Sequence, residues 1–291
     1  MTKPGHLEES QTSRREVSSL LSVDVTVQYP GKPAVLSNCA LEVRPGEVMG
    51  LIGQSGSGKS TLALTILGLL GRRRVKVEGR ISFQGADLLS MPEGDLRNLR
   101  GRALSLVLQS PLASLNPALR IRTQLREAWR VHRDETATKG DCEKSIRHAL
   151  ASVSLPSEDD FLEKRSSQLS VGQAQRVLIA MAVMHRPALL IADEATSALD
   201  VITQSEILQL FARLNRETGM SILYISHDLP SVAGICQRIA ILNDGEIVEC
   251  GPTSQIFAAP AHPYTRRLMA SLPQIPARPE LGSSKAQVAA H

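Results

Sequence analysis

The stretch Val48–Ser60, VMGLIGQSGSGKS, decides the fold class of this chain of 291 residues. Its apolar run Val48–Ile52 predicts a buried strand, and the residues from Ser60 to about Leu70 predict a helix. Between them, Gly53–Ser60 matches the phosphate-binding pattern GxxxxGK[ST], in the strand–loop–helix setting that this pattern requires. The sequence therefore predicts an α/β fold that binds a nucleotide.

The residues of this loop have chemical reasons to be there. Glycines let the backbone wrap closely around phosphate, and N–H groups at a helix N-terminus point toward it. We expect Lys59 to reach the β- and γ-phosphates of a nucleoside triphosphate, and the Ser60 hydroxyl to bind Mg²⁺. The nucleotide contacts predicted for this segment are Gly53, Gln54, Ser55, Gly56, Ser57, Gly58, Lys59, Ser60 and Thr61.

A second apolar run, Leu189–Ala192, ends in the acids Asp193 and Glu194. A buried strand that delivers a carboxylate to its C-terminal edge suits a Mg²⁺ contact, which we assign to Asp193. Strand alternation places Glu194 on the other face of the strand end, where it could accept a proton from an attacking water. The alternative is that both acids cap the following helix.

The segment Leu169–Gln173, LSVGQ, precedes this acidic strand and opens a helix that ends before Pro187. A Ser/Gly turn at a helix N-terminus is a second place where backbone N–H groups could hold phosphate oxygens. The chain therefore carries two candidate halves of a nucleotide site.

Strands and helices alternate along the rest of the chain. Ala188–Asp193 and Ser221–Ser226 predict buried strands on either side of a helix over Val201–Thr218, which indicates an α/β domain with a largely parallel sheet. Leu21–Val27 alternates apolar and polar residues as a half-buried strand does. The polar, helical stretch from about Ile121 to Leu169 has the character of an inserted lobe.

Composition limits the function classes. Hydrophobic residues make up 42%, enough for a substantial core, whereas aromatic residues make up only 3%, which argues against a nucleic-acid binder that stacks bases on aromatic side chains. The formal net charge of +4 is compatible with an anionic ligand or a membrane surface. No apolar run approaches the roughly 18 residues of a membrane span, so we expect any membrane role to act through a partner.

The cysteines and the termini add further expectations. The four cysteines lack metal-ligand spacing, which predicts reduced thiols and a cytoplasmic protein. Residues 1–19 are polar and predict a disordered leader, and the Pro-, Ala- and Ser-rich stretch from Pro273 predicts a loose tail. The basic cluster Arg72–Arg74 is expected to be a solvated loop.

Taken together, the motifs from about Leu20 to Ser271 resemble the ATP-binding subunit of an ABC transporter. Leu169–Gln173 resembles the family signature LSGGQ, which argues against other P-loop enzymes such as kinases and GTPases. The resemblance implies a P-loop cassette with a mainly parallel core sheet, an antiparallel β subdomain and an inserted helical subdomain. We place this domain at residues 20–258, its helical subdomain at about 115–185, and a C-terminal extension at 259–291.

The resemblance also implies roles for single residues. Gln109, which ends the predicted strand Leu104–Leu108, corresponds to the glutamine that touches Mg²⁺ and the attacking water. His227 corresponds to the switch histidine that contacts the γ-phosphate, and Tyr29 to the aromatic residue that stacks on adenine. The implied catalytic residues are Glu194, His227 and Gln109, and the implied metal ligands are Ser60, Gln109 and Asp193.

In this family two cassettes face each other head to tail, and each completes the other's site. The residues implied to act in trans are Ser170, Gly172, Gln173 and Asp200, the last of these ending the D-loop Ser197–Asp200. The chain departs from the family pattern at Val171, where glycine is usual, and at Ala195, where proline is usual. Both departures leave the contact residues themselves in place.

Two short segments resemble the peptide and nickel importer branch: Ser110–Pro117 and His262–Thr265. For the second segment, the alternative is a turn before a short helix, Arg266–Ala270. The tail lacks the cysteine cluster of some members, so no iron–sulfur cluster is expected.

The implied cofactors are ATP and Mg²⁺. The implied partners are membrane-spanning permease subunits, a second identical or related ATP-binding subunit and, indirectly, an extracytoplasmic solute-binding protein, with no nucleic acid. The implied location is the cytoplasmic face of the cell membrane. The alternative is a soluble ABC ATPase that acts on nucleic acid or ribosomes, and the transported solute stays open.

Overall fold

The computed structural model describes residues 19–71, 74–133 and 136–271. The leader predicted for residues 1–19 falls almost entirely outside the described residues. The predicted loose tail from Pro273 and residues 72–73 of the basic cluster also lie outside them.

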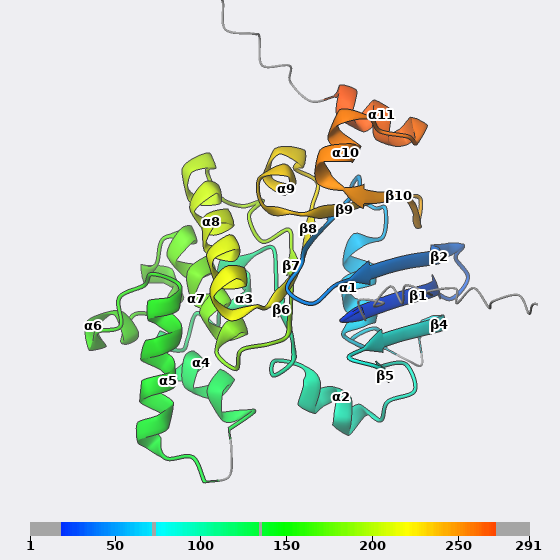
Figure 1. Ribbon diagram of the computed structural model, residues 1–291. Coiled ribbons are helices and arrows are strands. Elements are labelled where there is room, and N and C mark those ends of the chain that lie inside the picture. Colours follow the sequence, from blue (N-terminus) through cyan, green and yellow to red (C-terminus); the bar gives the residue numbers. More distant parts are fainter. Residues whose placement is uncertain (1–18, 72–73, 134–135, 272–291) are drawn as a thin grey trace, which may run out of the picture.

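A six-stranded sheet forms the centre of the molecule (Figure 1). All its neighbouring strands pair in parallel except for the edge pair β10–β9. The predicted mainly parallel core sheet is therefore confirmed. In spatial order its strands are β10 (Glu246–Pro252), β9 (Arg238–Asn243), β3 (Val48–Ile52), β8 (Ser221–Ser226), β7 (Leu189–Asp193) and β6 (Leu104–Val107).

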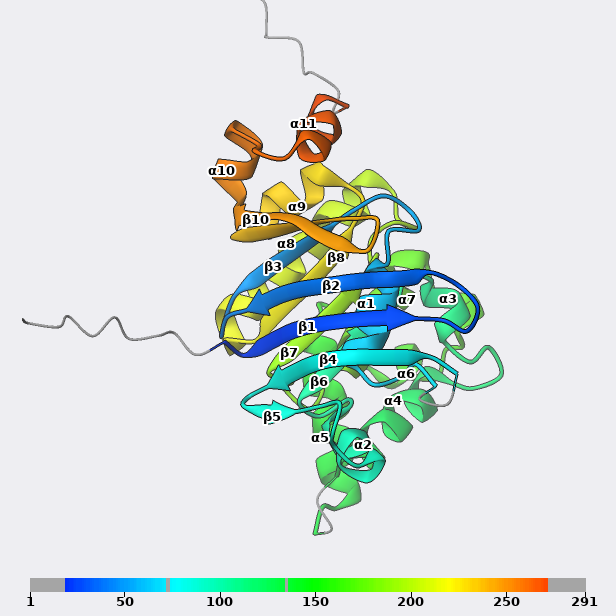
Figure 2. The ribbon, with the colours of Figure 1, turned by 90° about the vertical axis from the view of Figure 1, so that its right-hand side faces the viewer.

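A second sheet of four antiparallel strands packs beside the core sheet, as Figure 2 shows. Its alternating residues, such as Val23 and Ile81, face a buried cluster that also contains Leu51 and Ile225 of the core sheet and Leu62 of the first helix. This cluster joins the two sheets, and it confirms the expected antiparallel part. The strands, in spatial order, are β2 (Ala34–Val43), β1 (Leu21–Gln28), β4 (Lys76–Phe83) and β5 (Ala86–Asp87).

Most helices lie on the opposite face of the core sheet, with α5 and α6 farthest from the antiparallel sheet in Figure 1. A second buried cluster joins Leu190, Ile222 and Tyr224 of the sheet to Val177 and Phe211 of these helices. Within residues 19–71, 74–133 and 136–271, no helix combines the length and the apolar character needed to cross a bilayer. The helices are α1 (Lys59–Ile66), α2 (Glu93–Leu99), α3 (Pro111–Ser114), α4 (Ile121–Arg130), α5 (Lys139–Ser152), α6 (Asp159–Leu162), the 3₁₀ turn η1 (Ser166–Gln168), α7 (Val171–Val183), α8 (Val201–Thr218), α9 (Leu229–Ile235), α10 (Thr253–Ala258) and α11 (Pro263–Ala270).

Helix α1 is shorter than the sequence predicted: it ends at Ile66 instead of about Leu70. Gly68 has φ of 61°, a left-handed conformation that stops the helix and that glycine adopts at little cost. The guanidinium of Arg100 then donates to the carbonyl oxygens of Leu67 and Gly68 at 2.6 and 3.1 Å. These hydrogen bonds connect the C-terminal end of α1 to Arg100, the residue that follows α2.

Helix α10 packs on β10 and β9 at the edge of the sheet, and α11 lies next to α10 (Figure 1). The Glu249 carboxylate in β10 accepts the backbone N–H groups of Ala261 and His262 at 2.8 and 3.0 Å. His262 in turn caps α11, because its Nδ1 accepts the Tyr264 N–H. The predicted helix Arg266–Ala270 is therefore present and begins three residues earlier, at Pro263.

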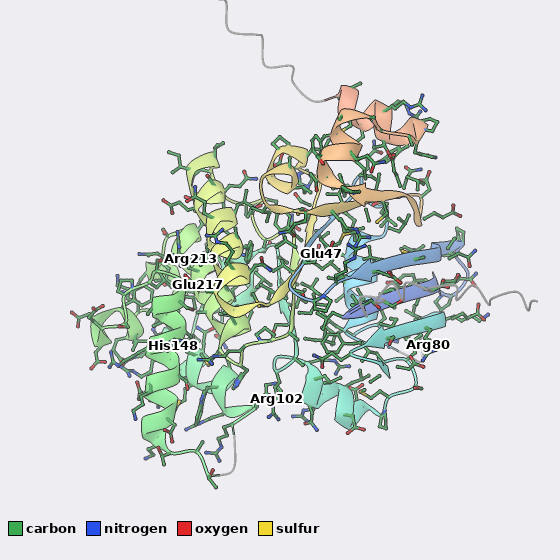
Figure 3. All side chains as sticks on the ribbon, in the orientation of Figure 1. Glu47, Arg80, Arg102, His148, Arg213 and Glu217 are labelled. Atoms are coloured by element: carbon green, nitrogen blue, oxygen red, sulfur yellow. The ribbon has the colours of Figure 1, made fainter. Side chains whose placement is uncertain are left out.

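Helix α8 connects the outer helices to the core. Arg213 donates to the carbonyl oxygen of Ser152 and to the Ser154 hydroxyl, at 2.8 and 3.1 Å, where α5 ends. Figure 3 shows Arg213 and Glu217 on α8, on the side where His148 extends from α5. At the other side of the core, the buried Glu47 accepts from Arg238 at 3.1 Å and fixes the start of β3 next to β9.

A cluster of ion pairs around Arg122 holds α4, α5 and α6 together. Its guanidinium lies 2.8 Å from Glu143, 2.7 Å from Asp159 and 3.0 Å from Glu163. Hydrogen bonding to Arg122 is the leading cause that lowers the pKa of Asp159 and of Glu163. A network around one planar guanidinium stabilises more than isolated surface pairs do.

Replacing Arg122 with methionine is expected to lower the melting temperature at pH 7 by about 2–4 °C, since three carboxylates lose a shared partner. The carboxyl pKa values are depressed in the folded state, so this stabilisation is present above their unfolded values. It is lost as the pH falls through their folded values, so the difference between wild type and variant should shrink below about pH 4. Calorimetry from pH 3 to 7 measures this difference. Lys76→Met is the control, because among the described residues Lys76 forms an ion pair only with the exposed Glu78.

Candidate functional site

Four parallel strands deliver their C-terminal ends to one edge of the core sheet. Ile52 of β3 lies opposite Ser226 of β8, and Asp193 of β7 lies opposite Ile225. Val107 of β6 pairs with Ala192 in the same way. The residues that follow these ends are the glycine-rich loop, His227, Glu194 and Gln109, so the register alone brings the predicted site residues to one place.

The glycine-rich loop allows no side chain at two of its glycines. A Cβ at Gly53 would lie 2.4 Å from the carbonyl oxygen of Leu242 and 2.6 Å from the Ser57 hydroxyl. Gly58 has φ of 107°, and a Cβ there would lie 2.7 Å from Leu36. The loop therefore keeps its tight path only with glycine at both positions, and α1 starts directly after it.

Lys59 lies inside this loop with its ammonium group bonded to the loop itself. Its Nζ donates to the carbonyl oxygens of Gly53 and Gln54 at 2.8 and 2.9 Å. Burial lowers the pKa of Lys59, and the negative charges of Glu194 and Asp193 oppose that shift. The Lys59 ammonium group thus lacks a full set of negatively charged partners, and it lies in a loop whose N–H groups can bind an anion. This arrangement suits an anionic ligand.

Asp193 is the predicted Mg²⁺ ligand, and its surroundings fit a hard cation. Burial raises the pKa of its carboxyl, the hydrogen bond from Ser60 lowers it, and the Glu194 charge adds to the rise. Its buried Oδ1 accepts no hydrogen bond from any residue that the structure describes, and the buried Ser57 hydroxyl has no such partner either. A carboxylate with an unused oxygen next to a hydroxyl is the oxygen donor set that Mg²⁺ takes.

Glu194 joins three of the predicted site residues. Its Oε2 accepts from Gln109 Nε2 at 3.0 Å, and its Oε1 lies 3.3 Å from His227 Nδ1 and 3.9 Å from Lys59 Nζ. Its side chain is 19% exposed, open enough to meet a water molecule. The predicted catalytic residues Gln109 and His227 therefore both contact the third, Glu194.

The direction predicted for Glu194 was wrong. Strand alternation no longer applies, because Glu194 has φ of 47° and its N–H donates to Ile225 on the neighbouring strand. This left-handed residue turns the carboxylate back toward Lys59, which Asp193 also faces. Both acids thus serve one pocket instead of two faces of the strand end.

The residues predicted to act in trans gather at the N-termini of α7 and α8. Ser170 caps α7 by accepting the N–H of Gln173, whose side chain accepts the N–H of Ser170, both at 3.1 Å. Asp200 caps α8 by accepting the N–H groups of Ile202 and Thr203.

The two helix starts are adjacent, because a Cβ at Gly172 would lie 2.7 Å from the Thr203 methyl group. Ser170 and Asp200 are exposed, and none of the contacts of the described residues joins Ser170, Gly172 or Gln173 to the glycine-rich loop. These residues form a face of their own, separate from the pocket around Lys59.

Tyr29, predicted to stack on adenine, is half-buried at the end of β1. It lines a shallow depression together with Gln28, Pro30, Gly31, Arg74, Val75 and Lys76. An aromatic ring that lines an open depression suits stacking on a planar base, and the role of Tyr29 stays a prediction.

The sequence reasoning missed the residues that hold the turn bearing His227. Asp228 donates its N–H to the Ser226 hydroxyl at 3.0 Å, and its carboxylate accepts from Gln204 of α8 at 2.8 Å. A serine two residues before an aspartate at a strand end is a signal for a side-chain-stabilised turn, and it was available in the sequence.

Two family models match the chain. The model described as "ABC transporter" matches residues 36–197, which span the glycine-rich loop, LSVGQ and the acidic strand. The model described as "Oligopeptide/dipeptide transporter, C-terminal region" matches residues 248–290, beginning in β10.

Similar proteins carry names of the same kind. The oligopeptide transport ATP-binding protein OppD of Escherichia coli is 36% identical over 272 residues, which cover 92% of this chain and 80% of OppD. The peptidoglycan transport ATP-binding protein YejF of Agrobacterium fabrum is 38% identical over 266 residues, 91% of this chain. The chain spans only 48% of the length of YejF.

Among solved structures, the dimeric ATP-binding cassette MJ0796 in a post-hydrolysis state, bound to ADP and Pi, superposes with a TM-score of 0.70. It is 28% identical and covers 80% of this chain and 98% of its own.

Proposed function

The chain belongs to the ABC transporter family, and we propose that it is an ATP-binding subunit that hydrolyses ATP to drive solute import. One observation carries this proposal: the Glu194 carboxylate lies within 3.0–3.9 Å of Gln109, His227 and Lys59, beside a glycine loop shaped for phosphate. Glu194 would be the general base, Gln109 and His227 would hold its carboxylate, and Lys59 would supply a positive charge. All four groups lie at one candidate anion site.

The arrangement supports direct attack of water on the γ-phosphate. The water oxygen bonds to the γ-phosphorus, Glu194 accepts the proton, and the bond from that phosphorus to the β–γ bridging oxygen breaks, so ADP leaves with the electron pair. Lys59 offsets the negative charge of the phosphates, and Gln109 and His227 fix the carboxylate of Glu194. Mg²⁺, held by Ser60, Gln109 and Asp193, would neutralise charge on the phosphate oxygens.

We propose that a second cassette completes each site. Ser170, Gly172 and Gln173 lie at the N-terminus of a 13-residue helix, where N–H groups and the helix dipole attract a phosphate. The capping box uses the acceptor lone pair of Ser170 and leaves its hydroxyl proton to donate to a ligand. ATP held between two such faces would bridge them, and hydrolysis would remove the bridge.

A groove next to Gln109 is our candidate surface for a membrane-embedded partner. It measures about 300 Å³ and is lined by residues of β6, α3 and α7, including Val107, Leu108 and Met181. Leu108 of this lining and Leu112 of α3, the helix whose Ser114 also lines the groove, are each 44% exposed, high for leucine in a folded chain. Because Leu108 directly precedes Gln109, a partner in this groove would act on the residue that holds Glu194.

We propose that the imported solute is a peptide or a related small molecule. The C-terminal match to the oligopeptide/dipeptide transporter region and the names of the relatives support this class over the nucleic-acid or ribosome alternative. In this proposal the chain sits on the cytoplasmic face of the membrane beneath permease subunits, and a solute-binding protein on the other side selects the cargo. Residues 20–258 form the cassette, with a helical part at about 115–185, and 259–291 form the extension.

Replacing Glu194 with glutamine is expected to lower ATP turnover at least about 100-fold, because the base is lost while the shape is kept. Binding of a fluorescent ATP analogue should stay within about twofold of wild type, and light scattering should report a dimer that persists with ATP. Glu217→Gln, an equal change on α8 (Figure 3), serves as control. Turnover near the wild-type rate in Glu194→Gln would show that another group accepts the proton.

The head-to-tail arrangement predicts that two inactive variants restore each other. Lys59→Ala damages the site of its own chain, and Ser170→Arg damages the site of the facing chain. Mixed in equal amounts, the two variants should form mixed dimers in which one of the two sites is intact. Roughly a quarter of all sites would then be intact, and activity should recover in proportion. If Ser170 acted on its own chain, the mixture would stay as inactive as its components.

A charge on α3, the helix whose Ser114 lines the groove, is expected to detach the chain from its membrane partner. Leu112→Asp should reduce the amount that sediments with washed native membranes several-fold, while nucleotide binding by the isolated chain is unchanged. Leu69→Asp is the matched control, because Leu69 is 49% exposed in the turn after α1 and does not line the groove. Equal sedimentation of the two variants would argue against this docking surface.

A further inference from the structure

One fully buried hydroxyl group lies just behind the site without touching it. Tyr224 is in the middle of β8, is 0% exposed, and packs its ring against Phe211 of α8. Its side chain points to the helical side of the core sheet, as Ile222 does. At that depth a hydroxyl costs free energy unless it is bonded, so its partners are informative.

The hydroxyl of Tyr224 is the centre of a chain of three hydrogen bonds. It lies 2.8 Å from Thr196 Oγ1 and donates to Ser231 Oγ at 3.3 Å, and Ser231 donates to the carbonyl oxygen of Asp228 at 2.8 Å. Each hydroxyl has one proton. Because the Tyr224 proton is used on Ser231, Thr196 must be the donor to Tyr224, and the chain runs in one direction from Thr196 to Asp228.

The two ends of this chain are next to the two groups that meet in the site. Thr196 follows Glu194 by two residues, in the segment whose Ser197 also donates to the Glu194 carbonyl oxygen. Asp228 follows His227 directly, and Gln204 of α8 holds its carboxylate at 2.8 Å. The chain therefore spans from the loop that carries the base to the loop that carries the histidine.

We propose that Tyr224 is a positioning residue that sets the distance between Glu194 and His227 through this chain of hydroxyl groups. The 3.3 Å contact between Glu194 and His227 joins two loops on adjacent strands, and His227 is 56% exposed. Exposed side chains on turns hold a geometry poorly unless the backbone below them is fixed. Thr196, Tyr224 and Ser231 supply this fixation from the buried side, where hydrogen bonds are strong and polarise one another.

A second buried tyrosine, Tyr264, provides a comparison, because its hydroxyl group belongs to no such chain of hydrogen bonds within the described part of the protein. Tyr264 of α11 is 6% exposed, and its hydroxyl has no partner among residues 19–71, 74–133 and 136–271. The fold thus tolerates a buried tyrosine without a bonded chain. Tyr264 lies far along the chain from β8, in the C-terminal extension, which makes it a matched control.

The inference rests on the proposed ATP hydrolysis, and the test keeps the two apart. Tyr224→Phe removes one oxygen and keeps the ring. In the isolated full chain, kcat for ATP should fall about 5- to 20-fold while KM changes less than about twofold, because the loss lies in positioning and not in binding. Tyr264→Phe, which also removes one buried oxygen, should leave kcat unchanged.

Two further measurements separate positioning from a loss of stability. In a His227→Ala background, Tyr224→Phe should change kcat by less than about twofold, since its effect passes through His227. Thr196→Val should reproduce the loss, whereas Thr196→Ser, which keeps the hydroxyl, should restore the rate. Melting temperatures of all variants are recorded so that rates refer to folded protein.

Three outcomes would overturn the inference. The first is a kcat for Tyr224→Phe equal to that of Tyr264→Phe. The second is a kcat of the double variant that falls by the product of the losses in Tyr224→Phe and His227→Ala. The third is an equal kcat for Thr196→Ser and Thr196→Val. If Glu194→Gln also turned over ATP at the wild-type rate, the proposed function would fail first; if it is inactive, only the role of Tyr224 is rejected.

Discussion

The in-register pairing of parallel strands is the constraint on which the site depends. Ile52, Ser226 and Asp193 mark the same edge of the core sheet, because β3, β8 and β7 pair without a shift at their C-terminal ends. A one-residue slip would turn each strand's side chains to the opposite face and move the residues that follow out of reach of each other. The apolar residues of both faces, buried in two separate clusters, oppose such a slip.

Burial at this edge makes the pocket receptive to an anion together with a cation. Burial lowers the pKa of Lys59 and raises the pKa of Asp193, so each charged form is disfavoured by loss of water and favoured by the other's charge. Neither has a complete set of partners: Lys59 rests on loop carbonyls, and one Asp193 oxygen accepts nothing from the described residues. A polyphosphate with its metal would supply both missing partners at once.

The sequence predicted the parts of this molecule whose signals are local. The strands β1, β3, β7 and β8 and the loop Gly53–Ser60 were found, because period, glycine spacing and flanks lie within a few residues of each other. The path of Glu194 was missed, since its left-handed backbone breaks the alternation that was assumed. The Arg122 cluster and the bonds of Tyr224 join residues distant along the chain, and no local pattern encodes such contacts.

The segment from Glu194 to Asp200 connects the chemistry of one site to the face that we propose for the neighbouring cassette. Its backbone is fixed at three points: Ser197 donates to the Glu194 carbonyl oxygen, Thr196 donates to Tyr224, and Asp200 caps α8. Because this short segment makes so many hydrogen bonds, it has little freedom to absorb a displacement that a facing subunit imposes at Asp200. The segment reaches the His227 turn through Thr196 and Tyr224, and α8, which Asp200 caps, reaches the same turn through Gln204. A contact at the exposed end of α8 can therefore bias the geometry of Glu194 and His227 together. A buried chain of hydroxyl groups suits this task better than an ion pair, because it sets distance and direction without the cost of desolvating a charge.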